Sequence, residues 1–222
     1  MLMKIMRRNI TLTVLFAFFL MGCSNASTGI VEISGPVSSI ATSQIDTADL
    51  VVINEHPDMS GYQWLNDDNP AFATISLQES VRVFAEGKTA VLYYGRETCP
   101  WCQRALPVLN EAAKQEDIII CYIDVGTGFV DNNQEILLDS AEGKKIYNEL
   151  TSYISSTFTE TDEEGNPSFH IPLVIAVRNG SITDSHTSLT EDTTVTTSDM
   201  DLSSHEKDEL LQIYKQLIQS AL

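Results

Sequence analysis

The stretch "YYGRETCPWCQRALPVLNEAA", residues 93–113, places two cysteines, Cys99 and Cys102, between an apolar run and a helical pattern. The run "AVLYY", residues 90–94, is unbroken, as in a strand buried on both faces. A cysteine at the junction of such a strand with a helix lies beside the unpaired N–H groups and positive end of that helix, which stabilise a thiolate. This pair is the candidate functional site. It could bind a metal, form a structural disulfide or exchange electrons with another protein.

Redox exchange is favoured over the other two interpretations. A tetrahedral zinc site needs four ligands, and the chain has no second CxxC. Its histidines show no paired spacing; they are His56, His170, His186 and His205. A disulfide that closes so short a loop constrains the unfolded chain little, so it is a poor structural staple. We therefore expect a redox pair, with no metal and no cofactor.

In this interpretation the two cysteines have different roles. Cys99, at the start of the helix, is the attacking thiolate, and Cys102, one helical turn further on, displaces a partner bound to Cys99. Pro100 falls at the first helical position, where its missing N–H had no partner to lose. Arg96 and Arg104 are close in sequence and are expected to support the thiolate of Cys99 through their charge.

Strand and helix signals alternate around the pair, at residues 72–75 (strand), 76–86 (helix), 90–94 (strand), 100–115 (helix) and 118–125 (strand). Ser76 and Glu79 form a capping-box pattern for the first helix. A weaker strand signal precedes them at residues 50–53. This alternation predicts an α/β domain with a central mixed sheet flanked by helices and with parallel pairing in its first half.

The second half has fewer clear signals. "IPLVIAV", residues 171–177, predicts a strand, and Asn179-Gly180 a hairpin turn into the next one. Ser203 and Glu206 predict a capping box for an amphipathic terminal helix. Residues 187–201 are expected to be a surface excursion without chemistry. In residues 126–168 we expect one helix and an acidic loop. The loop is interpreted as solvated and not as a calcium site, because its acidic residues lack the spacing of EF-hand ligands.

Two motifs resemble those of the thioredoxin superfamily. "CPWCQRALPVLNEAA", residues 99–113, is similar to the thioredoxin active-site helix, with Pro107 five residues after the second cysteine. "IPLVIAVRNG", residues 171–180, resembles the second thioredoxin signature, in which a cis-proline begins a strand. The resemblance covers most of residues 72–222 and is closest to bacteriocin transport accessory proteins. It implies a thioredoxin fold with an insertion at about 126–168, between the third strand and the cis-proline strand.

The resemblance also implies a function. Pro172 would be cis and lie against the cysteine pair, where the Ile171 backbone pairs with an incoming chain; the alternative is an ordinary proline at the start of a strand. Trp101, Ile171 and Leu173 would form an apolar docking lip. The chain would then be a thiol–disulfide oxidoreductase acting on cysteine-containing proteins together with a redox partner protein. The alternative is a non-catalytic accessory or binding module that assists peptide export.

The chain departs from thioredoxins beneath the pair. Thioredoxins carry a buried Asp six residues before the first cysteine, which assists proton transfer at the second; this chain has Tyr93 there. Their Lys on the next strand falls on Ile120. General reduction in the thioredoxin manner is therefore not implied. Cys121, in the same predicted strand, is expected to be a small core residue.

The N-terminus carries a targeting signal. Lys4, Arg7 and Arg8 precede an uncharged apolar stretch that ends in "LMGC", which resembles the bacterial lipobox. Cys23 would then carry a lipid; the alternative is an ordinary secretory signal with a chance cysteine. We expect a signal peptide at 1–22, a flexible tether at 23–46 and the domain at 47–222, in a protein held by lipid on the outer side of a bacterial cell membrane.

Charge excludes one class of partner. The chain has a formal charge of −18, and loss of residues 1–22 leaves 10 Lys and Arg against 31 Asp and Glu, a formal −21. Such a surface repels phosphate backbones and anionic membranes. We expect no nucleic-acid partner, contact with the membrane through the lipid on Cys23 alone, and a monomer.

Overall fold

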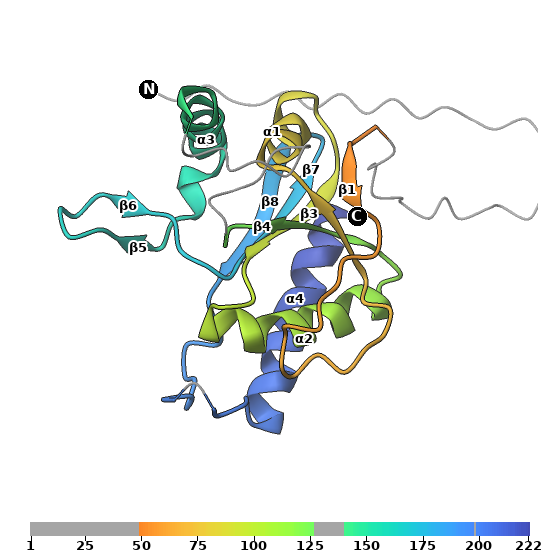
Figure 1. Cartoon of the computed structure of the whole chain (residues 1–222). Helices are drawn as coiled ribbons and strands as arrows, with labels where there is room; N and C mark the ends of the chain where they lie inside the picture. Colours follow the sequence, from red (N-terminus) through yellow and green to blue (C-terminus); the bar gives the residue numbers. More distant parts are fainter. Residues whose placement is uncertain (1–48, 127–139, 198) are drawn as a thin grey trace, which may run out of the picture. The chain divides into compact units, whose positions relative to one another are not determined.

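Strand β3 (Ala90–Gly95) runs through the middle of a six-stranded sheet of order β1-β2-β4-β3-β7-β8 (Figure 1). It is parallel to β4 (Ile120–Asp124) and antiparallel to β7 (Leu173–Arg178). The sheet continues with β2 (Phe72–Ile75), parallel to β4, and ends in the antiparallel edges β1 (Val52–Asn54) and β8 (Ser181–Thr187). All of β3 is buried, as its apolar run predicted, and the mixed sheet with its parallel first half is confirmed.

The structure, a computed structural model, describes residues 49–126, 140–197 and 199–222. They lie in the second of the two units into which the chain divides, residues 41–222. The expected signal peptide, the tether and Cys23 lie outside the described residues. None of the helices within the described ranges combines the length and apolarity that crossing a bilayer requires.

Four helices cover the sheet, two on each face (Figure 1). Helices α1 (Leu77–Ala85) and α3 (Ala141–Ile154) pack on one face, and α2 (Pro100–Gln115) and α4 (Ser204–Ala221) on the other. Side chains of β3 alternate between these two cores. Val91 and Tyr93 belong to the core under α2 and α4, whereas Leu92 and Tyr94 belong to the core under α1 and α3.

The two predicted capping boxes have different outcomes. Ser203 and Glu206 form the complete reciprocal pair at the start of α4. At α1 the Ser76 hydroxyl accepts the N–H of Glu79, but the Glu79 carboxylate accepts the N–H of Val51 at 2.9 Å. The reciprocal half of that box is therefore absent, because the carboxylate instead holds the chain just before the edge strand β1.

The expectation that residues 187–201 are a surface excursion is only partly right. Most described residues of this segment are at least partly exposed, but Leu189 and Val195 are buried, together with the following Leu202, in the core under α2 and α4. The Glu206 carboxylate also accepts the N–H of Thr194. The segment has neither helical nor strand periodicity, so its sequence gave no sign of burial, although single apolar residues anchor it to the domain.

The predicted insertion at 126–168 is only partly described, since residues 127–139 lie outside the described ranges. Helix α3 packs on the sheet as part of the domain, because its Leu150 and Ile154 are buried in the same core as the apolar side chains of α1. The acidic loop is exposed as expected, but it includes a small two-stranded sheet, β5 (Glu160–Thr161) with β6 (Pro167–Ser168).

The β7–β8 hairpin yields a stability prediction. Gly180 has a φ of +73°, and a Cβ there would meet the Phe84 carbonyl oxygen at 2.6 Å. Gly165 has a φ of +83° with nothing within 4 Å of the same atom, so it is the matched control. Gly165→Ala should lower the free energy of unfolding by about 1 kcal/mol, the penalty for a left-handed alanine. Gly180→Ala should lower it by about 1–3 kcal/mol more, from overpacking. Urea unfolding measures both, and equal losses would contradict the prediction.

Candidate functional site

The cysteine pair lies at the start of α2, just beyond the end of β3. Cys99 is the N-cap residue of α2, with φ −85° and ψ 120°, and its sulfur accepts the N–H of Cys102 at 3.2 Å. Pro100 occupies the first helical position, as expected. Both cysteines are free thiols; Cys99 is 5 % exposed and Cys102 is 0 % exposed. A sulfur thus takes the place of the oxygen that usually caps a helix.

The two thiols have opposite electrostatics. A hydrogen bond from the Cys102 thiol, the backbone N–H groups of Cys102 and Trp101 and the charge of Arg96 together lower the pKa of Cys99 to about 6, against the effect of its burial. Burial and the adjacent Cys99 raise the pKa of Cys102 far above that of an ordinary thiol. At neutral pH Cys99 is therefore a thiolate and Cys102 holds its proton, which is the division of roles that the sequence predicted.

Pro172, which directly precedes β7, is the proline expected to be cis. The Ile171–Pro172 bond is cis, and in its thiol form Cys99 donates to the Ile171 carbonyl oxygen, 3.9 Å from the sulfur. Ile171 is half-buried, Pro172 is buried and Trp101 is 38 % exposed. Ile171 thus lies against Cys99, although it is 72 residues away in sequence, and Pro172 is the residue that follows it.

One member of the predicted docking lip is not available. Leu173 is 1 % exposed and belongs to the core under α1 and α3. It is the first residue of β7 and pairs with Tyr94 of β3, so it already lies inside the sheet. The exposed apolar side chain beside the pair is that of Trp101, with Ile171 partly exposed.

The two arginines act in different ways. The charge of Arg96 lowers the pKa of Cys99, as expected. Arg104 is buried, and its guanidinium donates to the carbonyls of Pro100, Thr197 and Met200 while lying 4.5 Å from the centre of the Trp64 ring. The structure gives Arg104 a role that the sequence did not predict: it ties Thr197 and Met200 to the first turn of α2, because its fork-shaped donors match three carbonyls.

Gln103, which no sequence motif marks, holds the loop around residue 61 beside the cysteine pair. Its side-chain amide donates to the carbonyls of Gly61 and Glu97, and its oxygen accepts the N–H of Gln63 at 2.6 Å. A loop dense in turn formers gives no sequence signal for such contacts. Gln103 joins the loop around residue 61 to the CxxC turn.

Four buried tyrosines share the core of Cys102, three of them from β3, β4 and α4 and one from the loop before β2: Tyr93, Tyr122, Tyr214 and Tyr62. Each belongs to the same apolar core as the Cys102 side chain, and the charge of Cys102 acts on the pKa of each hydroxyl. Sequence comparison pointed to Tyr93 alone. The other three had no pattern that could have revealed them, because the fold brings them together from distant parts of the chain.

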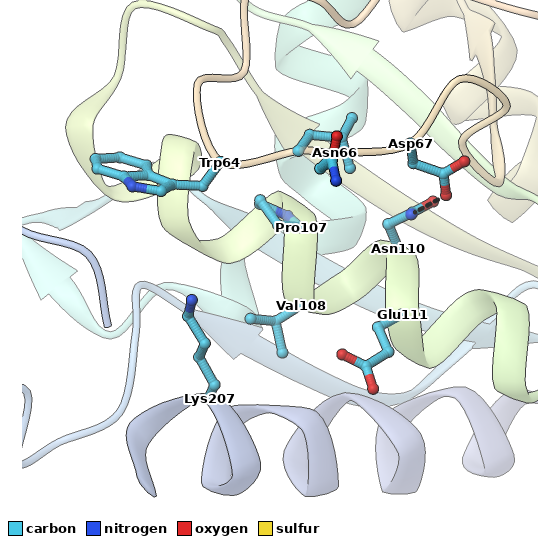
Figure 2. Close-up of a pocket in the computed structure, with 9 residues that line it drawn as sticks. Trp64, Asn66, Asp67, Pro107, Val108, Asn110, Glu111 and Lys207 are labelled. Atoms are coloured by element: carbon cyan, nitrogen blue, oxygen red, sulfur yellow. Dashed lines mark hydrogen bonds between the residues drawn. The ribbon is translucent and has the colours of Figure 1, made fainter. Parts of the chain in front are cut away.

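A hollow of about 270 Å³ lies further along α2, and neither cysteine lines it. Figure 2 shows the loop carrying Trp64 and Asp67 on one side of α2 and Lys207 of α4 on the other. The Asp67 carboxylate accepts from the Asn110 amide at 2.8 Å and pairs with Lys114, so its charge is already compensated. Within the described residues, no three His, Cys, Asp or Glu side chains lie together as metal ligands.

Comparison with models of known protein families finds none that matches the chain.

The unequal thiols predict a pH profile. An ordinary cysteine titrates near pH 9, whereas Cys99 should titrate near pH 6, so its alkylation rate should rise through pH 6 and level off above it. Cys102→Ala removes the hydrogen bond that lowers this pKa most, so the midpoint should move upward. Iodoacetamide kinetics with mass spectrometry measure both.

Cys121→Ala is the control for this profile. Burial raises the pKa of the Cys121 thiol to about 12, so its removal should leave the profile unchanged. A midpoint near 9 for Cys99 in the wild-type protein would refute the assignment.

Proposed function

We propose that this chain is a membrane-anchored, extracytoplasmic thiol–disulfide oxidoreductase of the thioredoxin superfamily. The observation that carries the proposal is the Cys99 sulfur at the N-cap of α2, held as a thiolate beside a protonated and buried Cys102. A purely structural thiol pair has no use for such a difference. An attacking group and a resolving group need it, because only the thiolate attacks a disulfide.

The reaction follows from the two protonation states. The Cys99 thiolate attacks one sulfur of a substrate disulfide, the substrate S–S bond breaks, and the other substrate sulfur leaves as a thiolate. Cys102 then loses its proton to the released thiolate or to water and attacks the Cys99 sulfur. The bond from Cys99 to the substrate breaks as the Cys99–Cys102 disulfide forms. The substrate is reduced by two electrons and the pair is oxidised; the reverse sequence oxidises a dithiol substrate.

Substrate proteins would dock over Trp101, Ile171 and Pro172. Trp101 offers exposed apolar surface beside Cys99, and the Ile171 carbonyl lies within 3.9 Å of the attacking sulfur. A backbone segment hydrogen-bonded there would present its disulfide directly to Cys99, as in strand addition to a sheet edge.

The order of elements supports a thioredoxin fold for residues 72–222. A β-α-β-α-β half with parallel pairing is followed by an antiparallel hairpin and a terminal helix. In this proposal residues of about 126–168 contain the insertion. Lipid on Cys23 would hold the domain, with its tether at 23–46, on the outer side of a bacterial membrane.

Trapping tests the proposed function. Cys102→Ser should accumulate mixed disulfides through Cys99, because the resolving thiol is gone, whereas Cys99→Ser should trap little. Non-reducing gels after acid quenching detect the adducts, and insulin reduction measures turnover by the wild type. Cys121→Ser should behave as the wild type. Equal trapping by both active-site variants would refute the roles, and a wild type unable to exchange with any disulfide would favour the accessory-module alternative.

Processing tests the proposed anchor. The mature protein should partition with membranes and carry the added mass of a lipid, while Cys23→Ser should remain unprocessed or be released. Membrane fractionation followed by mass spectrometry of the N-terminal peptide reports both. Wild-type protein found in the medium without lipid, cut at another position, would contradict the anchor.

A further inference from the structure

Cys102 shares its apolar core with a cluster of aromatic rings. Tyr93 of β3 stacks on Tyr122 of β4, with ring centroids 5.6 Å apart and 24° between the planes, and Phe72 contacts both rings. The hydroxyls of Tyr62 and Tyr122 are hydrogen-bonded to each other at 3.2 Å. Tyr214 of α4 belongs to the same core, and its ring contacts that of His186 edge to face. Two of the four hydroxyls therefore satisfy one another, which leaves those of Tyr93 and Tyr214.

The Tyr93 hydroxyl is buried and has no hydrogen bond of regular geometry among the described residues. It lies against Gly95, where a Cβ would come within 2.4 Å of the hydroxyl oxygen. A buried hydroxyl without a partner is unfavourable, so its retention needs a reason. The hydroxyl of Tyr214 is also unpartnered among the described residues, but of the four tyrosines Tyr93 is the one whose hydroxyl lowers the pKa of the Cys102 thiol, as it also lowers that of Tyr62.

These hydroxyls are donors and cannot serve as bases. Burial raises the pKa of all four tyrosines above the ordinary value, and the nearby charges of Asp124 and Glu97 raise that of Tyr122 further. Each therefore keeps its proton at neutral pH. A neutral thiol is a weak acceptor, whereas a thiolate is a strong one, so a Tyr93 O–H without a regular bond gains one when Cys102 ionises.

We propose that the Tyr93 hydroxyl is the hydrogen-bond donor that stabilises the Cys102 thiolate while Cys102 resolves the mixed disulfide. The inference rests on the proposed redox function. The Cys102 proton leaves to the released substrate thiolate or to water, and the Cys102 thiolate attacks the Cys99 sulfur. The bond from Cys99 to the substrate breaks, and the second substrate thiolate departs. Tyr93 keeps its proton throughout, and with the backbone N–H of Arg96 it gives the Cys102 sulfur two donors.

Ellman's reagent separates the two steps in the purified full-length chain carrying Cys23→Ser, because an unlipidated Cys23 thiol would release a coloured half of its own. It is an aromatic disulfide, and each half that leaves is coloured. The first release reports attack by Cys99, and the second reports resolution by Cys102. Tyr93→Phe should leave the first phase unchanged and slow the second about tenfold, the usual strength of a hydrogen bond to a charged group. The Cys99 alkylation midpoint should stay at about pH 6, because the groups that lower this pKa are the Cys102 thiol, the first N–H groups of α2 and Arg96, and all of them remain in the variant.

Tyr94→Phe is the matched control. Tyr94 is the next residue of β3 and is equally buried, and among the described residues its hydroxyl also lacks a hydrogen-bond partner, but it belongs to the core on the opposite face of the sheet. Both phases should be unchanged in this variant. Gly95→Ala is the second variant, because its Cβ displaces the Tyr93 hydroxyl without removing it, and it too should slow the second phase.

The outcomes are distinguishable. A second phase of wild-type speed in folded Tyr93→Phe overturns the inference and leaves the redox function intact. Equal slowing in Tyr93→Phe and Tyr94→Phe also overturns it, since a general packing defect would then explain the effect. Should Tyr93→Phe fail to fold by circular dichroism, the second phase of Gly95→Ala decides. A wild type that releases no second half would overturn the redox function itself, and the inference with it.

Discussion

The site depends on one hydrogen bond, in which the Cys99 sulfur caps the N-terminus of α2. In most helices a side-chain oxygen accepts the free N–H groups at this position. The helix begins at Pro100 directly after the turn that leaves β3, so the cap has to be Cys99. Because β3 and β7 are antiparallel neighbours, the end of β3 lies beside the start of β7, and Pro172 directly precedes that start. The sulfur is therefore fixed by the helix on one side and approached by the Ile171 carbonyl on the other.

The difference between the two thiols follows from depth and direction. Cys99 stands at the helix end, where N–H groups point at its sulfur, and those groups outweigh its burial. Cys102 lies one turn inside, in a core that it shares with aromatic rings, where burial dominates and disfavours its charged form. The ionisable groups that share its core are the hydroxyls of the four tyrosines, and no carboxylate belongs to that core among the described residues. Neutral hydroxyls place no second negative charge beside a forming thiolate, but they also supply no base.

Segments distant in sequence hold this arrangement in place from outside. Arg104 ties Thr197 and Met200 to the Pro100 carbonyl, and Gln103 ties the loop at Gly61 to the turn before Cys99. Both side chains lie on the first turns of α2, beside the cysteines they follow in sequence. The helix thus serves two purposes: its end polarises the sulfur, and its flanks fix the loops around it.

Sequence alone determined the features that depend on neighbouring residues. The buried strand β3, the start of α2 at Pro100, the hairpin at Asn179-Gly180 and the cap of α4 all follow from local periodicity, turn chemistry and capping, which act within a few residues. The tertiary structure alone decided the burial of Leu173, the contacts of Arg104, the packing of residues 187–201 and the four tyrosines that share the core of Cys102. Those features join residues from separate strands, helices and loops, and no periodicity along the chain encodes which of them will meet in space.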